Sequence, residues 1–188
     1  MTTDPRFMPR DDFALGKPEW WTSDHWATPW PVVHELEAEF GKFDLDVCCH
    51  ADTAKAAKFY TPAENGLIQP WEGRRWLNPP YSKVSPWLER AISETDSGRA
   101  SLVVALLPAC TDTRWFHGLV KDRAEIRFIK GRVRFFGWQK TPITQPKTPS
   151  ILAIYRHRHD WADSAIDDFV CTKCGEHGSP SIKSGSEW

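Results

Sequence analysis

Residues 101–107 have the sequence Ser-Leu-Val-Val-Ala-Leu-Leu, and Pro108 follows them. A nearly continuous apolar run of this length is typical of a strand that is covered on both faces, as the strands of a parallel sheet are. Helical patterns alternate with apolar runs along the chain, which predicts an α/β fold: a mostly parallel sheet with helices on both faces. The other expected strands lie at residues 43–48, 75–77, 124–129, 133–136 and 150–155.

Proline and glycine residues indicate where the helices begin and end. Thr28-Pro29 and Ser85-Pro86 each place a capping side chain before a proline, which predicts a helix start. The first helix is expected to end at Gly41. Residues 51–58 are expected to form a further helix. The buried face of the first helix would carry Val32, Val33, Leu36 and Phe40.

The composition suits one domain with a small appendage. The chain has 188 residues, of which 40% are apolar and 26% charged. Its eleven tryptophans suit core burial, stacking on planar ligands, or both. The net charge is only -1, yet nine Lys or Arg residues and one acid lie between Arg123 and Arg158. This basic stretch could contact phosphates or be a solvated surface, and charge alone leaves both interpretations open.

Targeting and redox signals point to the cytoplasm. The first residues lack the apolar segment of a signal peptide, and no apolar window is long enough to span a membrane. The five cysteines are odd in number and unevenly spaced, which does not suit a secreted disulfide framework. We therefore expect a cytoplasmic protein with no membrane partner and no obligate protein partner.

The motif Asn78-Pro79-Pro80-Tyr81 carries the chemistry. It follows a predicted strand, and two prolines without N–H groups would end that strand in a stiff turn. Ligands of open α/β sheets bind beyond the carboxyl ends of the strands, where this turn would lie. The Asn78 amide oxygen and the Pro79 carbonyl are two acceptors that can hold both hydrogens of a planar amine and turn its lone pair toward an electrophile. The Tyr81 ring offers a surface for stacking.

This motif resembles the active-site signature of amino-methyltransferases that use S-adenosylmethionine. From Trp26 to Tyr155 the sequence is similar to the phage-type, Dam-like DNA N6-adenine methyltransferases. The resemblance implies a Rossmann-like methyltransferase domain at residues 25–158, between a flexible segment at 1–24 and a tail at 159–188. The similar segments are WATP (26–29), FDLDVCC (43–49), FYTPAENGL (59–67), WLNPPYS (76–82), LLPACTDTRWFH (106–117) and GRVRF (131–135).

The family resemblance also implies roles for individual residues. Asn78 and Pro79 would bind the adenine N6 amine, and Tyr81 would stack on a base that has been flipped out of the duplex. With Pro80 these residues form the predicted catalytic set. The predicted cofactor site consists of Thr28, Pro29, Asp46, Asn65, Leu67 and Asn78.

Two departures from the family pattern concern the cofactor site. Cys48-Cys49-His50 stands where the family has a Gly-rich loop, and Asn65 replaces a carboxylate. Close approach of the backbone to the cofactor after Asp46 must therefore be arranged differently than in the family. Thr28 could equally be a plain helix cap.

The basic stretch supplies the predicted DNA contacts. Arg132 and Arg134 alternate along an expected strand, so they contact DNA phosphates or only face solvent. The complete predicted set is Arg132, Arg134, Lys140 and Lys147.

A Cys-x-x-Cys pair in the tail is half of a zinc site. Cys171, Cys174 and His177 would be three ligands, with His157 or His159 as the fourth. A lone pair without a second one is a weak signal, so the sequence favours a tail without zinc and keeps the zinc site as an alternative.

The motif and the family resemblance together imply a phage or prophage DNA adenine-N6 methyltransferase that acts in the host cytoplasm, with S-adenosylmethionine as cofactor and DNA as partner. Three alternatives stay open: methylation of a protein glutamine at N5, methylation of cytosine at N4, and a DNA-binding homologue without catalysis.

Overall fold

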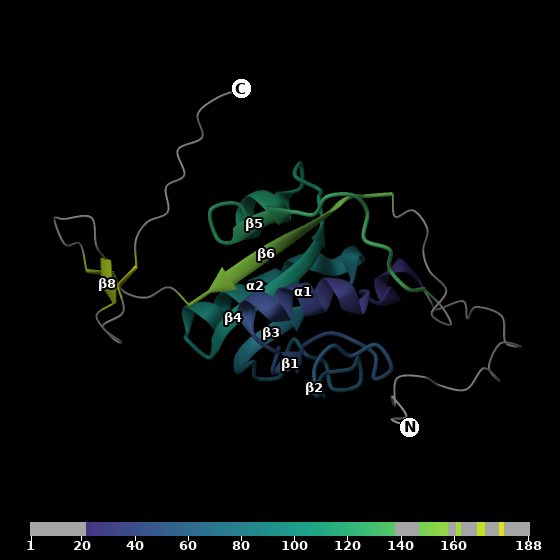
Figure 1. Ribbon diagram of the computed structural model, residues 1–188, viewed down its shortest axis with the longest axis horizontal. Coiled ribbons are helices and arrows are strands. Elements are labelled where there is room, and N and C mark those ends of the chain that lie inside the picture. The colour runs from purple at the N-terminus through teal and green to yellow at the C-terminus, as the bar shows by residue number, and fades with distance from the viewer. Residues whose placement is uncertain (1–21, 138–146, 158–160, 163–168, 172–176, 179–188) are drawn as a thin grey trace, which may run out of the picture. The chain divides into compact units, whose positions relative to one another are not determined.

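The structure is a computed structural model that describes residues 22–137, 147–157, 161–162, 169–171 and 177–178. The chain divides into two compact units, Met1–His157 and Arg158–Trp188. In the second unit, β7 (Trp161–Ala162), β8 (Phe169–Cys171) and β9 (His177–Gly178) form an antiparallel sheet in the order β7-β8-β9. The first unit holds a six-stranded sheet and the helices that cover it (Figure 1).

The six-stranded sheet has the order β2-β1-β3-β4-β6-β5. β2, β1, β3 and β4 pair in parallel, whereas β6 is antiparallel to both of its neighbours. The sheet is therefore mixed, with β6 alone opposing the other five strands. Among the described residues no helix lies between β5 and β6, and a chain that returns without a crossover helix re-enters the sheet in the opposite direction. The strands are β1 (Leu45–Asp46), β2 (Lys58–Phe59), β3 (Gly73–Leu77), β4 (Ala100–Pro108), β5 (Glu125–Phe128) and β6 (Ser150–Arg156).

Helices cover both faces of this sheet, as predicted. On one face α1 (Trp30–Phe40) packs through Val33 and Leu36 against Leu102, Val104 and Leu106 of β4. On the other face α2 (Val84–Asp96) and the π-helical turn η4 (Phe116–Val120) pack against Val103, Ala105 and Leu107 of β4. Successive β4 residues point to opposite faces, and both faces are buried, which explains the continuous apolar run. Two 3₁₀ turns, η2 (Ser23–His25) and η3 (Tyr81–Lys83), complete this unit.

The first predicted helix is confirmed, but its start is wrong. The helix begins at Trp30, and Pro29 occupies the capping position in an extended conformation (φ -65°, ψ 140°) without a side-chain cap. Thr28 therefore does not cap α1. Gly41 ends the helix as predicted, with a φ of +79° that suits glycine.

Two other predicted elements are absent from the structure. The segment 51–58 forms no helix: residues 51–57 are turns and bends, and Lys58 begins β2. The backbone N–H of Lys55 donates to the buried carboxylate of Asp46 at 2.9 Å, which holds the segment in a loop. Residues 133–136 form no strand: their only pairing in the described chain is an isolated bridge between Phe136 and Ala27. Val133 and Phe135 are nevertheless buried, so their alternation reflects core packing, not a ladder.

Within the described ranges, no helix combines the length and the apolar character that a membrane crossing requires.

Candidate active site

The site lies at the carboxyl ends of β1 and β3. These two strands pair in parallel, with Asp46 opposite Trp76, so Asp46 and Asn78 reach the same edge of the sheet. A small hollow of about 30 Å³ and a larger cavity of about 420 Å³ open there. The two adjoin, because five residues line both: Asp24, His25, Cys48, Cys49 and His50.

Asn78 lines the small hollow, and its amide group is oriented by the backbone. Its Nδ2 donates to the carbonyl oxygen of Trp26 at 3.0 Å. Its Oδ1 is buried and has no hydrogen-bond partner in the structure. Leaving a buried acceptor unpaired costs about 1–3 kcal/mol, so this atom favours a ligand that donates an N–H.

Tyr81 packs its ring against the core. The ring meets that of Phe135 edge-on, with centroids 6.3 Å apart and planes at 86°. The Tyr81 hydroxyl is buried without a partner, and burial raises the pKa of this phenol. Phe135 is buried too. Pro79 is buried, and Pro80 lines the larger cavity.

An N-terminal strap, defined here as residues 22–29, contacts the loop that follows β3. The Asp24 carboxylate accepts hydrogen bonds from the Ser82 backbone N–H at 3.0 Å and the Ser82 hydroxyl at 2.5 Å. Ala27 and Phe136 exchange two backbone hydrogen bonds of 2.9 Å each. The strap thus fixes the loop after β3. The sequence did not point to Asp24, because this residue and Ser82 are 58 positions apart and only the folded chain brings them into contact.

Thr28 and Asp46 line the small hollow beside Asn78. Thr28 is buried, and its hydroxyl has no hydrogen-bond partner. Asp46 is 1% exposed, and burial raises the pKa of its carboxyl to about 6. The carboxylate accepts hydrogen bonds from the backbone N–H groups of Lys55 at 2.9 Å and Cys48 at 3.3 Å. Asp46 therefore organises the loop that stands in place of the Gly-rich one.

Asn65 and Leu67 line the larger cavity, apart from the other predicted cofactor residues. Asn65 has a φ of +55°, and its Oδ1 accepts a hydrogen bond from the Leu67 N–H at 3.3 Å. Between them Gly66 is forced by close approach, because a Cβ there would lie 2.1 Å from the Val47 carbonyl oxygen. Pro29 lines neither cavity.

Of the predicted DNA-binding residues, the three that the structure describes line neither cavity. Arg132, Arg134 and Lys147 are exposed, and the residues between the two arginines and after them, Val133 and Phe135, are buried. The arginines therefore face outward together. Lys140 lies outside the described residues.

The described part of the chain leaves the predicted metal site untested. Cys171 is in β8 and His177 is in β9, with only their backbones described, and Cys174 falls outside the described residues. Elsewhere in the described residues, no cluster of three His, Cys, Asp or Glu side chains could hold a metal ion.

Comparison with known proteins gives consistent matches. A family model described as DNA N-6-adenine-methyltransferase (Dam) matches residues 18–170. A DNA N-6-adenine-methyltransferase of Haemophilus phage HP1 (strain HP1c1) is 39% identical over 136 residues, which cover 70% of this chain and 78% of that protein. One of Escherichia phage T1 is 35% identical over 109 residues, which cover 57% of this chain and 45% of that protein. With Asn78-Pro79-Pro80-Tyr81 at the edge of the sheet and the family match spanning most of the chain, this protein belongs to the DNA N-6-adenine-methyltransferase (Dam) family.

Proposed function

We propose that this chain transfers a methyl group from S-adenosylmethionine to the N6 amine of adenine in DNA. The family supports this reaction, as do the names of the two phage relatives. The observation that carries the proposal is the buried, unpaired Oδ1 of Asn78 at the carboxyl end of β3. This atom is an acceptor whose direction is already fixed, and an exocyclic amine is a donor that fits it.

The cavities fit S-adenosylmethionine in size and polarity. The larger cavity, at about 420 Å³, lies within the usual range for small-molecule sites and is lined partly by rings such as Tyr60 and Trp87. The adjoining hollow contains the unpaired Thr28 hydroxyl. S-adenosylmethionine supplies a methyl group on a sulfonium centre. We propose that the residues holding it are Thr28, Asp46, Asn65, Leu67 and Asn78; Pro29 lines neither cavity and is not part of this set.

The architecture supports a Rossmann-like methyltransferase fold as part of this proposal. Strands β2, β1, β3 and β4 are parallel neighbours, and helices cover both faces of the sheet. Open α/β sheets bind their ligands in the crevice beyond the carboxyl ends of such strands. Both cavities occupy that position.

The contribution of the protein to the reaction is orientation. The Asn78 Oδ1 and the Pro79 carbonyl accept the two N6 hydrogens, which turns the nitrogen lone pair toward the methyl group. Pro80 stiffens the turn, and the Tyr81 ring supports the plane of the base. As the amine gains positive charge in the transition state, the two acceptors stabilise it. The adenine must leave the duplex first, because its N6 is engaged inside a base pair.

The exposed cations after β5 are proposed to hold the DNA backbone. Arg132, Arg134 and Lys147 are exposed, and Lys140 belongs to the same proposed set. Cations at such positions attract phosphates without reading the sequence.

Methylation of DNA in the test tube tests the proposal. We expect the full chain, given labelled S-adenosylmethionine and unmethylated DNA, to produce N6-methyladenine, identified by chromatography of the digested nucleosides. Asn78→Ala should lower kcat roughly 10²–10³-fold, the usual cost of losing one transition-state hydrogen bond. Asn78→Asp is the matched variant: it keeps an acceptor but loses the donor to the Trp26 carbonyl. Its kcat should therefore lie between that of the unaltered chain and that of Asn78→Ala.

Other products would contradict the proposal in distinguishable ways. Label found only in protein would indicate glutamine-N5 methylation, and N4-methylcytosine would indicate a different base. No transfer to either polymer, from a chain that still binds DNA, would indicate a homologue without catalysis.

A further inference from the structure

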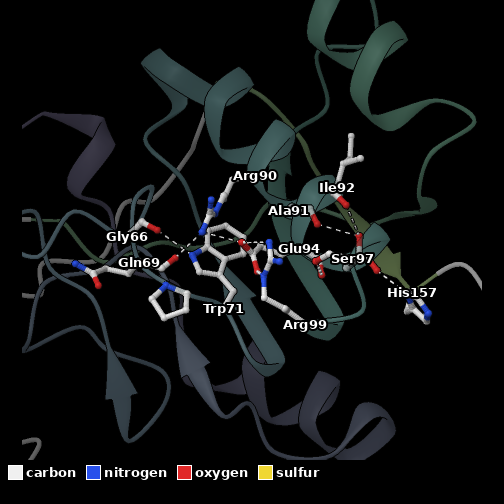
Figure 2. A network of polar contacts seen from close by, with 12 residues as sticks. Gly66, Gln69, Trp71, Arg90, Ala91, Ile92, Glu94, Ser97, Arg99 and His157 are labelled. Carbon is white, nitrogen blue, oxygen red and sulfur yellow. Dashed lines mark hydrogen bonds and ion pairs between the residues drawn. The ribbon is translucent and has the colours of Figure 1, made fainter.

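A loop that lines the larger cavity is hydrogen-bonded to a side chain of α2. The floor loop, defined here as residues 65–71, lines the cavity through Asn65, Gly66 and Leu67. Two hydrogen bonds fix this loop (Figure 2): within it, Trp71 Nε1 donates to the Gly66 carbonyl at 2.8 Å, and from α2 the Arg90 guanidinium donates to the Gln69 carbonyl at 2.9 Å. Both bonds engage backbone carbonyls, so they set the course of the main chain.

Arg90 is itself held by a buried acid. Glu94 lies one turn further along α2 with a relative exposure of 0%. Its carboxylate contacts the Arg90 guanidinium at 2.7 Å, and it accepts two hydrogen bonds from Arg99 at 2.7 and 3.1 Å. A buried carboxylate is costly unless it is paired, and here two guanidinium groups pair with it. The Arg90 side chain is thus fixed between Glu94 and the floor loop, as Figure 2 shows.

A second connection runs through two tryptophans. Trp71, at the end of the floor loop, is fully buried, and its ring lies nearly parallel to that of Trp87 in α2, with centroids 6.4 Å apart. Trp87 lines the larger cavity. A displacement of the floor loop would therefore move Trp71 against a residue of the cavity wall.

Arg90, Glu94 and Arg99 line neither cavity, so they can act on a ligand only through the floor loop and Trp87. We propose that Arg90, held by Glu94, is a positioning residue for cofactor binding: it fixes the main chain of the floor loop that forms one wall of the cofactor cavity. This inference rests on the proposed use of the larger cavity by S-adenosylmethionine.

The test compares cofactor binding with DNA use in the full chain. The variants are Arg90→Met, Arg90→Lys and Glu94→Gln, and the control is Glu39→Gln, which weakens an exposed ion pair with Arg127. Calorimetry with S-adenosylhomocysteine gives the Kd, steady-state assays give kcat and both KM values, and thermal unfolding gives Tm.

We expect Arg90→Met to raise the Kd for S-adenosylhomocysteine and the KM for S-adenosylmethionine about tenfold, the order for one hydrogen bond from a charged donor. The KM for DNA and kcat should change less than about twofold, because the loop after β3 is untouched. Arg90→Lys should recover part of the lost affinity, Glu94→Gln should follow Arg90→Met, and Glu39→Gln should leave the Kd unchanged.

A merely structural role would give a different pattern. If Arg90→Met lowered Tm but left the Kd unchanged, or lowered kcat and weakened both substrates in proportion, the inference would be wrong while the proposed function stood. If the unaltered chain bound no S-adenosylhomocysteine and methylated no DNA, both would be overturned. Should Glu94→Gln fail to fold, the Kd values of Arg90→Met and Arg90→Lys still show whether Arg90 positions the floor loop for cofactor binding.

Discussion

Asp46 is an ionisable group that is almost fully buried. Its carboxylate joins the end of β1 to the loop at Cys48 and Lys55 through two backbone hydrogen bonds. Those bonds favour the charged form, but burial outweighs them and raises the pKa from 3.8 to about 6. The residue therefore stabilises the local structure by its geometry while its charge opposes folding.

This balance predicts a pH dependence of stability. The pKa of Asp46 is higher in the folded chain than in the unfolded chain. The contribution of Asp46 to the free energy of unfolding is therefore fully present below pH 3.8 and is lost as the pH rises through about 6. The free energy of unfolding of the unaltered chain, minus that of Asp46→Asn, should fall across this interval by at most about 3 kcal/mol. Urea unfolding at a series of pH values measures it.

Asp44→Asn is the matched control for this titration. Hydrogen bonds from Arg74 lower the pKa of the exposed Asp44 carboxyl below 3.8, so its contribution is complete above that pH and is lost only as the pH falls. Its difference curve should stay level between pH 4 and 6. An Asp46→Asn curve parallel to that of the unaltered chain would show that the buried carboxyl does not titrate there.

Part of the site could be predicted from the sequence. Thr28, Asp46 and Asn78 were predicted to belong to one site, and the structure places all three around the small hollow, although their roles remain predictions. Asp24 and Trp26 could not be found in this way. Their contacts with Ser82 and Asn78 join residues 58 and 52 positions apart, and neither pattern nor composition records such a pairing.

At the scale of elements, strong local signals were predictive and weak ones were overridden by long-range contacts. The apolar runs of β4 and β6 and the glycine stop at Gly41 are confirmed. Residues 51–58 contain good helix formers, but the hydrogen bond from the Lys55 N–H to Asp46 holds the segment in turns up to the start of β2 at Lys58. The antiparallel direction of β6 was not predicted. Alternating helices and strands suggest that each strand is joined to the next through a crossover helix, and the sequence does not show that β6 lacks such a connection.

The end of α1 gives a prediction at this scale. Gly41 has a φ of +79°, and a Cβ there would lie 2.2 Å from a terminal nitrogen of Arg74, which must move aside. Gly41→Ala should therefore lower the free energy of unfolding by about 1–3 kcal/mol, the cost of holding a residue with a Cβ at a φ of +79° and a ψ of 170°. Denaturant unfolding with an unchanged m-value measures the difference.

Gly118→Ala is the control for that loss. Gly118 lies in η4 with open space around its Cα, so alanine there should be neutral or stabilise by up to about 1 kcal/mol. Equal losses in both variants would mean that side-chain addition as such, and not backbone conformation, weakens the fold.

The whole molecule is nearly neutral, so DNA binding must depend on local charge. Replacing Arg132, Arg134 and Lys147 by glutamine should reduce the slope of log K against log salt concentration by about 3, since each phosphate contact contributes about 0.9. Fluorescence anisotropy with a short duplex at several salt concentrations measures the slope. Lys121→Gln, an exposed cation outside the basic stretch, should leave it unchanged. An unaltered slope in the triple variant would mean that these three residues do not contact the DNA phosphates.

The single reversed strand has a consequence for synthesis. β6 lies between β4 and β5 and contributes Ile151 and Ala153 to one hydrophobic core and Leu152 and Ile154 to the other. A nascent chain that ends before Ser150 lacks a central strand, so neither layer can close and β4 keeps an open edge. The site at β1 and β3 is synthesised early but can become rigid only after the ribosome has released residue 156. Nascent chains should therefore acquire resistance to protease abruptly, once the chain has been synthesised past β6 and this strand has left the ribosome.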